Sequence, residues 1–234
     1  AWRPDKAMKV EKPGFGDYVR KVGELTGIDT STCRGFFEAI DKRMEFFNSM
    51  GCRAADHGID YVYCTRASDS ELEQIFQKGV EGKALTPLEV EKYKSMILIH
   101  LAHGYAKYCW VMQVHFGAVR DPNTAMYKRL GSDTGFDYMG DCSCAQAIGK
   151  LMDALMQEGS LPKMIWYSLN PADNPVIATA IGGFQGPEAR GKIQQGAAWW
   201  FNDTIRGMRR QIDELMENGL LAKSVGMLTD SRSF

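Results

Sequence analysis

The stretch that decides the fold prediction is Gly226-Met-Leu-Thr-Asp-Ser-Arg-Ser-Phe234. An apolar run from Ser224 to Leu228 leads into Asp230 and Arg232, which is typical of a buried strand followed by a polar loop. In an α/β barrel the loops after the strands build the active site, so an acid and a guanidinium here are placed for chemistry. A βα unit normally covers its strand with the next helix, so an ending at this point suggests a piece of a larger barrel.

Short apolar runs alternate with long amphipathic stretches along the chain, a pattern that predicts repeated βα units around a parallel sheet. The expected strands are Gly51 to His57, Trp110 to Gly117, Lys163 to Leu169, Lys192 to Ala198 and Ser224 to Thr229. The expected helices are residues 14–26, 32–50, 69–79, 87–108, 144–157, 175–181 and 202–218. We therefore expect an α/β fold of the (β/α)8 TIM-barrel type, here a partial barrel of about five parallel strands. An open doubly wound sheet is the alternative, although the phosphate-binding glycine motifs of such sheets are absent from the sequence.

The domain organisation is expected to be simple. Residues 1–234 contain no linker and no low-complexity segment, which favours a single domain. Residues 66–108 would place more helices between two strands than one crossover needs, so they are expected to form a helical insertion on the barrel.

The composition excludes several classes of protein. The chain carries 28 basic and 29 acidic residues, dispersed along its 234 positions, so it lacks the basic patch that nucleic-acid binding requires. No apolar stretch is long enough to span a bilayer, and no signal segment opens the sequence. The 6 cysteines show no Cys-x-x-Cys spacing, which favours reduced thiols. We therefore expect a cytoplasmic enzyme without nucleic-acid or membrane partners.

Polar or aromatic residues follow several of the expected strands. Asp56 could act as a base, with His57 as its partner or as a ligand, although an Asp-His pair could equally cap the next segment. Alternation places His115 on one face of its strand together with Gln113, where it could reach a metal or a substrate. Trp199, directly after a strand, could form a wall of a sugar site. Arg3, near the start of the chain, is by default a solvated charge.

The acid and the guanidinium of the last segment have complementary chemistry. Asp230 could bind a metal and move protons, and Arg232 could hold a substrate carboxylate by a two-pronged hydrogen bond. The alternative is a local Asp-Arg ion pair, which is common on protein surfaces.

Several distinctive segments occur in an order that matches one known family. They are Trp2-Arg-Pro-Asp-Lys6, Gly51-Cys-Arg-Ala-Ala-Asp-His-Gly58, Trp110-Val-Met-Gln-Val-His-Phe-Gly-Ala118, Asn170-Pro-Ala-Asp-Asn174, Trp199-Trp-Phe-Asn-Asp203 and Gly226 to Phe234. Together they resemble uronate isomerase, a sugar-acid isomerase of the amidohydrolase superfamily. The resemblance implies interconversion of D-glucuronate with D-fructuronate, and of D-galacturonate with D-tagaturonate, through an enediol in hexuronate breakdown.

The resemblance also implies roles for individual residues and a divalent metal, with zinc as the expected ion. Asp230, Asp56 and His115 are expected to be catalytic, and Asp230 and His115 to be metal ligands. Arg3, Trp199 and Arg232 are expected to line the substrate pocket.

One part of the family pattern is missing from these residues. The family's His-x-His metal pair does not occur among the 4 histidines, so it is expected before Ala1, and the final helix is expected after Phe234. The alternatives are therefore a metal-dependent hydrolase on the same barrel and an inactive half-barrel, whose exposed sheet edges would favour a homo-oligomer.

Overall fold

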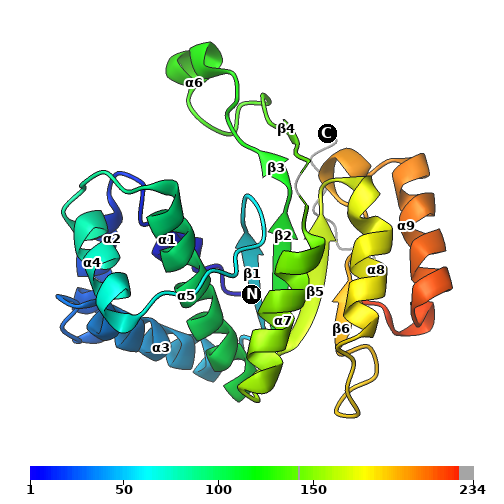
Figure 1. Ribbon diagram of the computed structural model, residues 1–234, viewed down its shortest axis with the longest axis horizontal. Helices are drawn as coiled ribbons and strands as arrows, with labels where there is room; N and C mark the ends of the chain where they lie inside the picture. Colours follow the sequence, from blue (N-terminus) through cyan, green and yellow to red (C-terminus); the bar gives the residue numbers. More distant parts are fainter. Residues whose placement is uncertain (142, 227–234) are drawn as a thin grey trace. The chain divides into compact units, whose positions relative to one another are not determined.

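The structure is a computed structural model that describes residues 1–141 and 143–226. Its main sheet has four strands in the order β1-β2-β5-β6, with a separate two-stranded sheet formed by β3 and β4 (Figure 1). The strands of the main sheet are β1 (Ala54–Gly58), β2 (Val111–Phe116), β5 (Lys163–Ser168) and β6 (Ile193–Gln195). β5 and β6 are parallel, with Met164 opposite Ile193.

Four of the five expected strands are thus confirmed, although β6 is shorter than expected and ends before Gly196. Ser224, Val225 and Gly226 belong to no strand. The remainder of the fifth expected strand lies outside the described residues, as do Asp230 and Arg232.

The chain divides into two compact units. Unit 1 consists of Ala1–His57, Tyr63–Met112 and Lys150–Pro162. Unit 2 consists of Gly58–Val62, Gln113–Gly149 and the described residues of 163–234. Helix α7 (Ala145–Gln157) begins in unit 2 and ends in unit 1. The single domain and the helical insertion stay predictions.

Unit 1 is mostly helical. Its helices are α1 (Asp5–Met8), α2 (Phe15–Thr26), α3 (Cys33–Ser49), α4 (Asp69–Val80) and α5 (Pro87–Lys107). Its core holds an aromatic cluster in which Phe36 stacks on Phe76 with ring centroids 5.7 Å apart, while Phe15 meets both rings edge-on. These rings come from three helices, so their burial fixes how the helices pack.

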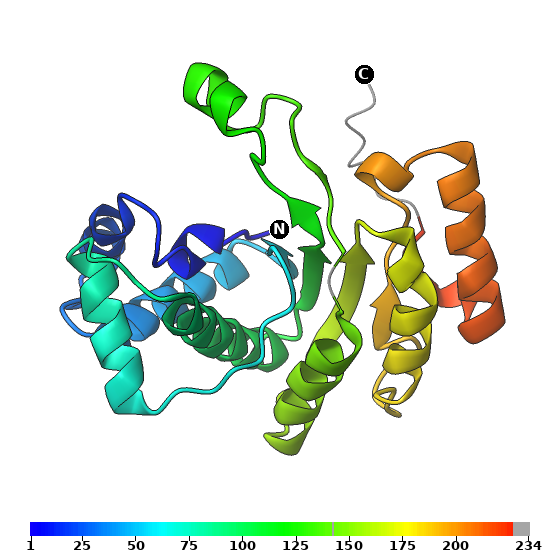
Figure 2. The same ribbon diagram turned by 45° about the horizontal axis from the view of Figure 1, so that its top comes forward.

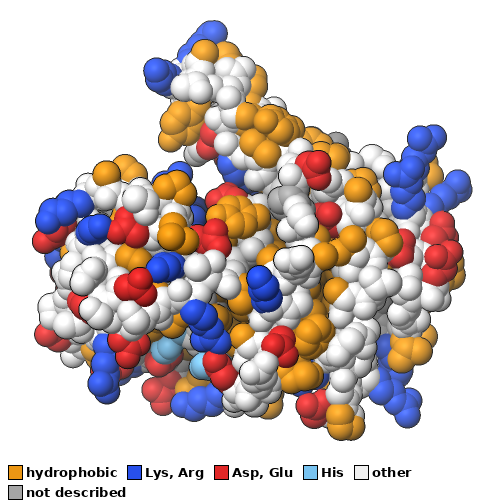
Figure 3. All heavy atoms as spheres, in the orientation of Figure 1, with side chains coloured by type: hydrophobic (Ala, Val, Ile, Leu, Met, Phe, Trp, Pro, Cys, Tyr) orange, Lys and Arg blue, Asp and Glu red, His pale blue; other side chains and the backbone are white. Residues whose placement is uncertain are grey.

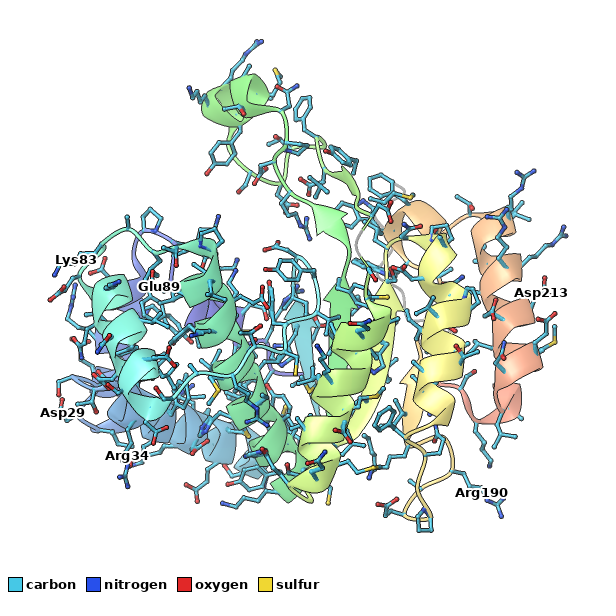
Figure 4. All side chains as sticks on the ribbon, in the orientation of Figure 1. Asp29, Arg34, Lys83, Glu89, Arg190 and Asp213 are labelled. Atoms are coloured by element: carbon cyan, nitrogen blue, oxygen red, sulfur yellow. The ribbon has the colours of Figure 1, made fainter. Side chains whose placement is uncertain are left out.

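The starts of α4 and α5 follow from the sequence. Each begins with a capping box: Ser68 with Glu71 for α4, and Thr86 with Glu89 for α5. Glu89 lies in the first turn of α5 (Figure 4). This arrangement satisfies backbone N–H groups that have no partner within the helix.

Unit 2 contains the parallel pair β5 and β6, with α8 (Asn174–Gly182) and α9 (Ile205–Asn218). Helix α8 lies beside β6, and α9 lies beside α8, in two views of the molecule (Figures 1 and 2). Short 3₁₀ turns occur at Pro171–Asp173, Trp200–Asn202 and Leu221–Lys223. Helix α9 begins at Ile205 rather than at the expected residue 202, because the 3₁₀ turn occupies the residues before it.

An arm follows β2 in unit 2. It runs through β3 (Ala118–Val119), α6 (Thr124–Leu130) and β4 (Tyr138–Met139), and β3 pairs antiparallel with β4. Gly117 connects β2 to the arm with a φ of 88°, a backbone conformation that favours glycine. None of the residues of α6 is buried. The structure adds this arm and helix α1 to the elements expected from the sequence.

Candidate functional site

The expected site residues that the structure describes fall into two groups, one in each unit. The Arg3 cluster, in unit 1, comprises Arg3, Asp5, Asp56, His57 and Tyr105. The His115 cluster, in unit 2, comprises Gln113, His115, Ser168, Tyr167, Asp173, Gly196 and Trp199.

Backbone pairing at the start of the chain positions Arg3. Trp2 forms a parallel bridge with Ala55, and the N–H of Asp56 donates to the carbonyl of Trp2 at 2.9 Å. The residues before α1 therefore run alongside β1, which brings Arg3 next to Asp56. A distance of 3.0 Å separates Arg3 Nη1 from Asp56 Oδ2.

A second carboxylate holds the same guanidinium. Arg3 Nε donates to Asp5 Oδ2 at 2.9 Å, so the guanidinium joins α1 to β1. The expectation of a merely solvated arginine is too simple, although the Arg3 side chain is still 54% exposed. Burial opposes ionisation of Asp5, but His57 and Arg3 outweigh it, and the pKa of Asp5 lies below its usual value.

His57 lies behind Asp5 and is completely buried. His57 Nδ1 lies 3.3 Å from Asp5 Oδ1, and His57 Nε2 lies 3.0 Å from the hydroxyl oxygen of Tyr105. Burial raises the pKa of Tyr105 well above its usual value, and the nearby charge of Asp5 adds to that effect. Tyr105 therefore remains a neutral phenol. His57 was expected to be a ligand or the partner of Asp56; the acid that lies against it is instead Asp5.

The ring of His115 is held between aromatic groups. Along β2 the odd-numbered residues are partly exposed and the even-numbered ones buried, so His115 shares a face with Gln113 as expected. His115 stacks on Tyr167 with ring centroids 4.2 Å apart and planes 8° apart. Trp199 meets His115 edge-on with centroids 4.6 Å apart.

The ring of Tyr167 also lies close to the backbone of Gly196, the residue after β6. A methyl group placed on Gly196 would lie 2.0 Å from the Tyr167 ring, so no larger residue fits there without moving the ring. The Tyr167 hydroxyl donates to Gln113 Oε1 at 3.1 Å. Gly196 thus leaves room for the Tyr167 ring, which in turn stacks on the imidazole of His115.

The two adjacent tryptophans have different environments. Trp199 Nε1 donates to the carbonyl of Ser168 at 3.1 Å. Trp200 has a φ of 50°, stacks on Phe201 at 5.0 Å, and carries the Arg120 guanidinium 4.7 Å from its ring centroid. Trp199 is thus the tryptophan that contacts His115, while its expected place in the wall of a substrate pocket stays a prediction.

The structure adds an acid that was not among the expected site residues. Ser168 Oγ, at the end of β5, donates to Asp173 Oδ2 at 2.5 Å and accepts from the N–H of Asn170 at 3.0 Å. Burial raises the pKa of Asp173. The Asn170-Pro171 turn signalled a loop after a strand, but nothing in the sequence linked Asp173 to Ser168.

No complete metal site occurs in residues 1–141 and 143–226, where no three His, Cys, Asp or Glu side chains come close enough to hold an ion. Asp230 lies outside these residues. A cavity of about 310 Å³ in unit 2, lined by Ile181, Ile193, Leu215 and others, contains none of the expected site residues. No helix within the described ranges is long and apolar enough to cross a membrane.

The chain is similar to proteins of known sequence and structure along its whole length. A model of the glucuronate isomerase family matches residues 1–234. The uronate isomerases of Caldanaerobacter subterraneus subsp. tengcongensis and Haemophilus influenzae are 47% and 46% identical to it, each over 100% of this chain and 50% of the relative.

Two crystal structures share its fold. Uronate isomerase from Thermotoga maritima has a TM-score of 0.89 and 34% identity, over 99% of this chain and 50% of that one. Glucuronate isomerase from Caulobacter crescentus has a TM-score of 0.86 and 26% identity, over 100% of this chain and 47% of that one.

The parallel sheet, with polar and aromatic side chains following its strands, defines part of an α/β enzyme barrel of the TIM type. With the match over residues 1–234, the chain belongs to the glucuronate isomerase family. It spans about half the length of the curated relatives it matches. These relatives are isomerases, so the assignment favours the isomerase expectation over the hydrolase.

Proposed function

We propose that the intact protein carrying these residues is a uronate isomerase of the cytoplasm, which interconverts D-glucuronate with D-fructuronate and D-galacturonate with D-tagaturonate in hexuronate catabolism. The observation that carries the proposal is the family match over residues 1–234. The reaction moves a proton between adjacent carbons through an enediol, so it needs a base and a group that stabilises the developing oxyanion.

The Arg3 cluster supplies groups suited to a sugar acid. Arg3 is charged at every relevant pH and presents planar donors that match a carboxylate. It is held by Asp5 and Asp56 while its side chain stays 54% exposed, so it can reach a ligand without losing its orientation. We assign Arg3 as the residue that binds the substrate carboxylate. We assign Asp56, the acid paired with Arg3, as a catalytic residue.

The His115 cluster supplies an oriented imidazole and an aromatic wall. The stack on Tyr167 and the edge of Trp199 restrict the rotation of His115, which favours a defined ligand or proton-transfer geometry. Trp199 is assigned to the wall of the sugar pocket. Asp230 and Arg232 are assigned as the proton-transfer base and as a second carboxylate anchor.

The protein is further proposed to use a divalent metal, with zinc as the expected ion and His115 and Asp230 among its ligands. Imidazole and carboxylate are both zinc ligands, but a catalytic zinc usually holds about three protein ligands. Residues 1–141 and 143–226 offer no group of three such ligands, so by themselves they do not fit the ion.

The test is isomerisation of D-glucuronate by the intact protein and by its Asp230→Asn variant. The amide keeps the shape of the side chain but removes the base and the anionic ligand, so turnover should be lost. Asp213→Asn serves as the control, because Asp213 is an exposed acid of α9 (Figure 4). Formation of D-fructuronate by the Asp230→Asn variant at the wild-type rate would refute the assigned role.

The 234-residue chain alone is expected to be inactive, as in the half-barrel alternative, because it spans half the length of its relatives. Its purified form with added zinc should produce no D-fructuronate. Clear turnover would mean that these residues suffice.

A further inference from the structure

Asp5 has no assigned part in the reaction, yet it contacts both Arg3 and His57. Its Oδ2 accepts from Arg3 Nε at 2.9 Å, while Asp56 lies 3.0 Å from Nη1 of the same guanidinium. A guanidinium is planar and its N–H groups point in fixed directions. Contacts from two carboxylates on different elements therefore determine the plane of the group as well as its position.

Asp5 is itself fixed from behind. Its Oδ1 lies 3.3 Å from His57 Nδ1, and His57 Nε2 lies 3.0 Å from the Tyr105 hydroxyl. His57 and Tyr105 are both 0% exposed, so neither ring can move without disturbing the core of unit 1. Three side chains, Tyr105, His57 and Asp5, thus connect the interior of the unit to the exposed Arg3.

The simplest competing interpretation is a surface ion pair of little consequence, which exposed pairs usually are. The Asp5 side chain is only 14% exposed, and a buried imidazole lies behind it. The local charges also favour a role in orientation. Two carboxylates around one guanidinium reduce its attraction for an anionic ligand. A second acid is therefore better explained by orientation than by affinity.

We propose that Asp5 is a positioning residue of the uronate site, which holds the Arg3 guanidinium in the orientation that meets the substrate carboxylate. His57 and Tyr105 keep Asp5 in place. This inference rests on the proposed function, because it takes the carboxylate of a sugar acid as the group that Arg3 binds.

The kinetic signature follows from where the carboxylate lies. It is remote from the reacting carbons, so Arg3 binds it equally in the ground state and in the transition state. Loss of such uniform binding raises KM and leaves kcat nearly unchanged. A variant that is merely partly unfolded would instead lower the apparent kcat and leave KM unchanged.

The experiment compares Asp5→Ala with wild type in the intact protein. We expect KM for D-glucuronate to rise roughly tenfold, which corresponds to the loss of about one charge-assisted hydrogen bond. The kcat should stay within about twofold of the wild-type value. Asp17→Ala is the matched control, because Asp17 pairs with Arg20 on the exposed face of α2. Tyr105→Phe, which keeps the ring and removes the hydroxyl, should raise KM in the same direction but less.

Calorimetric binding of two inert ligands separates positioning from general damage. An open-chain six-carbon sugar acid should bind Asp5→Ala about tenfold more weakly than wild type. The corresponding uncharged polyol should bind both equally. If Asp5→Ala does not fold, Asp5→Asn replaces it and should show the same pattern with a smaller change.

Two results would overturn the inference: KM and acid affinity within twofold of wild type, or equal losses for the acid and the polyol. Failure of the proposed function is distinguishable from these two results, because the wild-type protein itself would then form no D-fructuronate.

Discussion

Replacement of Tyr167 by leucine tests whether the stack that holds His115 matters for function. The ring of Tyr167 covers one face of the imidazole at 4.2 Å, with the planes nearly parallel at 8°. Leucine keeps an apolar side chain but is smaller and offers no flat surface, so His115 gains rotational freedom. A stacked aromatic pair contributes about 0.5–1.5 kcal/mol beyond its buried area. If the proposed role of His115 requires a fixed plane, kcat/KM should fall by roughly 2- to 13-fold.

The structure offers two further variants that separate the causes. Tyr167→Phe keeps the stack and removes the hydroxyl that donates to Gln113 at 3.1 Å; Gln113 is partly exposed, so water can satisfy its side chain. It should therefore be close to wild type. Gly196→Ala leaves Tyr167 unchanged but places a methyl group 2.0 Å from its ring. It should displace the ring and lower kcat/KM as the leucine variant does.

The assay is the initial rate of D-fructuronate formation by the intact protein at several concentrations of D-glucuronate. Circular dichroism of each variant checks that the fold is retained. The reasoning fails if Tyr167→Leu keeps the wild-type kcat/KM, or if Tyr167→Phe loses as much activity as Tyr167→Leu.

Two predictions concern stability and can be measured on the 234-residue chain. Phe36→Ala should lower the free energy of unfolding by about 3–5 kcal/mol in urea titrations, because Phe36 is fully buried. The control Phe46→Ala should cost far less, because the Phe46 side chain is 47% exposed. Equal losses of stability in the two variants would contradict the assigned core. Hydrogen bonds from Lys78, and then from the backbone and hydroxyl of Thr86, hold the pKa of Glu89 at about 2, below its usual 4.5. Because the pKa is lower in the folded state, this stabilisation is present above pH 4.5 and is lost as the pH falls toward 2. The Tm of wild type should therefore exceed that of Glu89→Gln most near neutral pH, and the difference should vanish near pH 2. A difference in Tm that does not depend on pH would contradict the assignment. Glu81→Gln, at an exposed position, is the control.

The elements that could be predicted from the sequence were those with a strong local signal. The alternation of β2 and the apolar run of β5 marked both strands, and Thr86 with Glu89 marked the start of α5. Helices α1 and α6 were missed because 4 and 7 residues are too few to show a helical period.

The sequence allowed the candidate site residues to be predicted, but not the contacts that they make. Strand ends identified Asp56, His115 and Trp199 as candidates. The partners that orient them come from distant parts of the sequence: Tyr105 lies 48 residues from His57, and Tyr167 lies 54 residues from Gln113. Such pairings depend on how the elements pack, which hydrophobic period alone does not specify.

The arm formed by β3, α6 and β4 has a consequence for how this part of the chain can vary. Tyr127, Leu130, Tyr138 and Met139 are exposed on it, and hydrophobic side chains gather over the arm in Figure 3. A two-residue ladder and the 2.6 Å ion pair of Arg120 with Asp137 hold its base, beyond which little is buried. Opening such a segment costs little of the free energy that maintains the rest of a fold. The arm at α6 is therefore a place in unit 2 where inserted sequence, such as a fused peptide tag or an added loop, would be accommodated with little disturbance of β2 and β5.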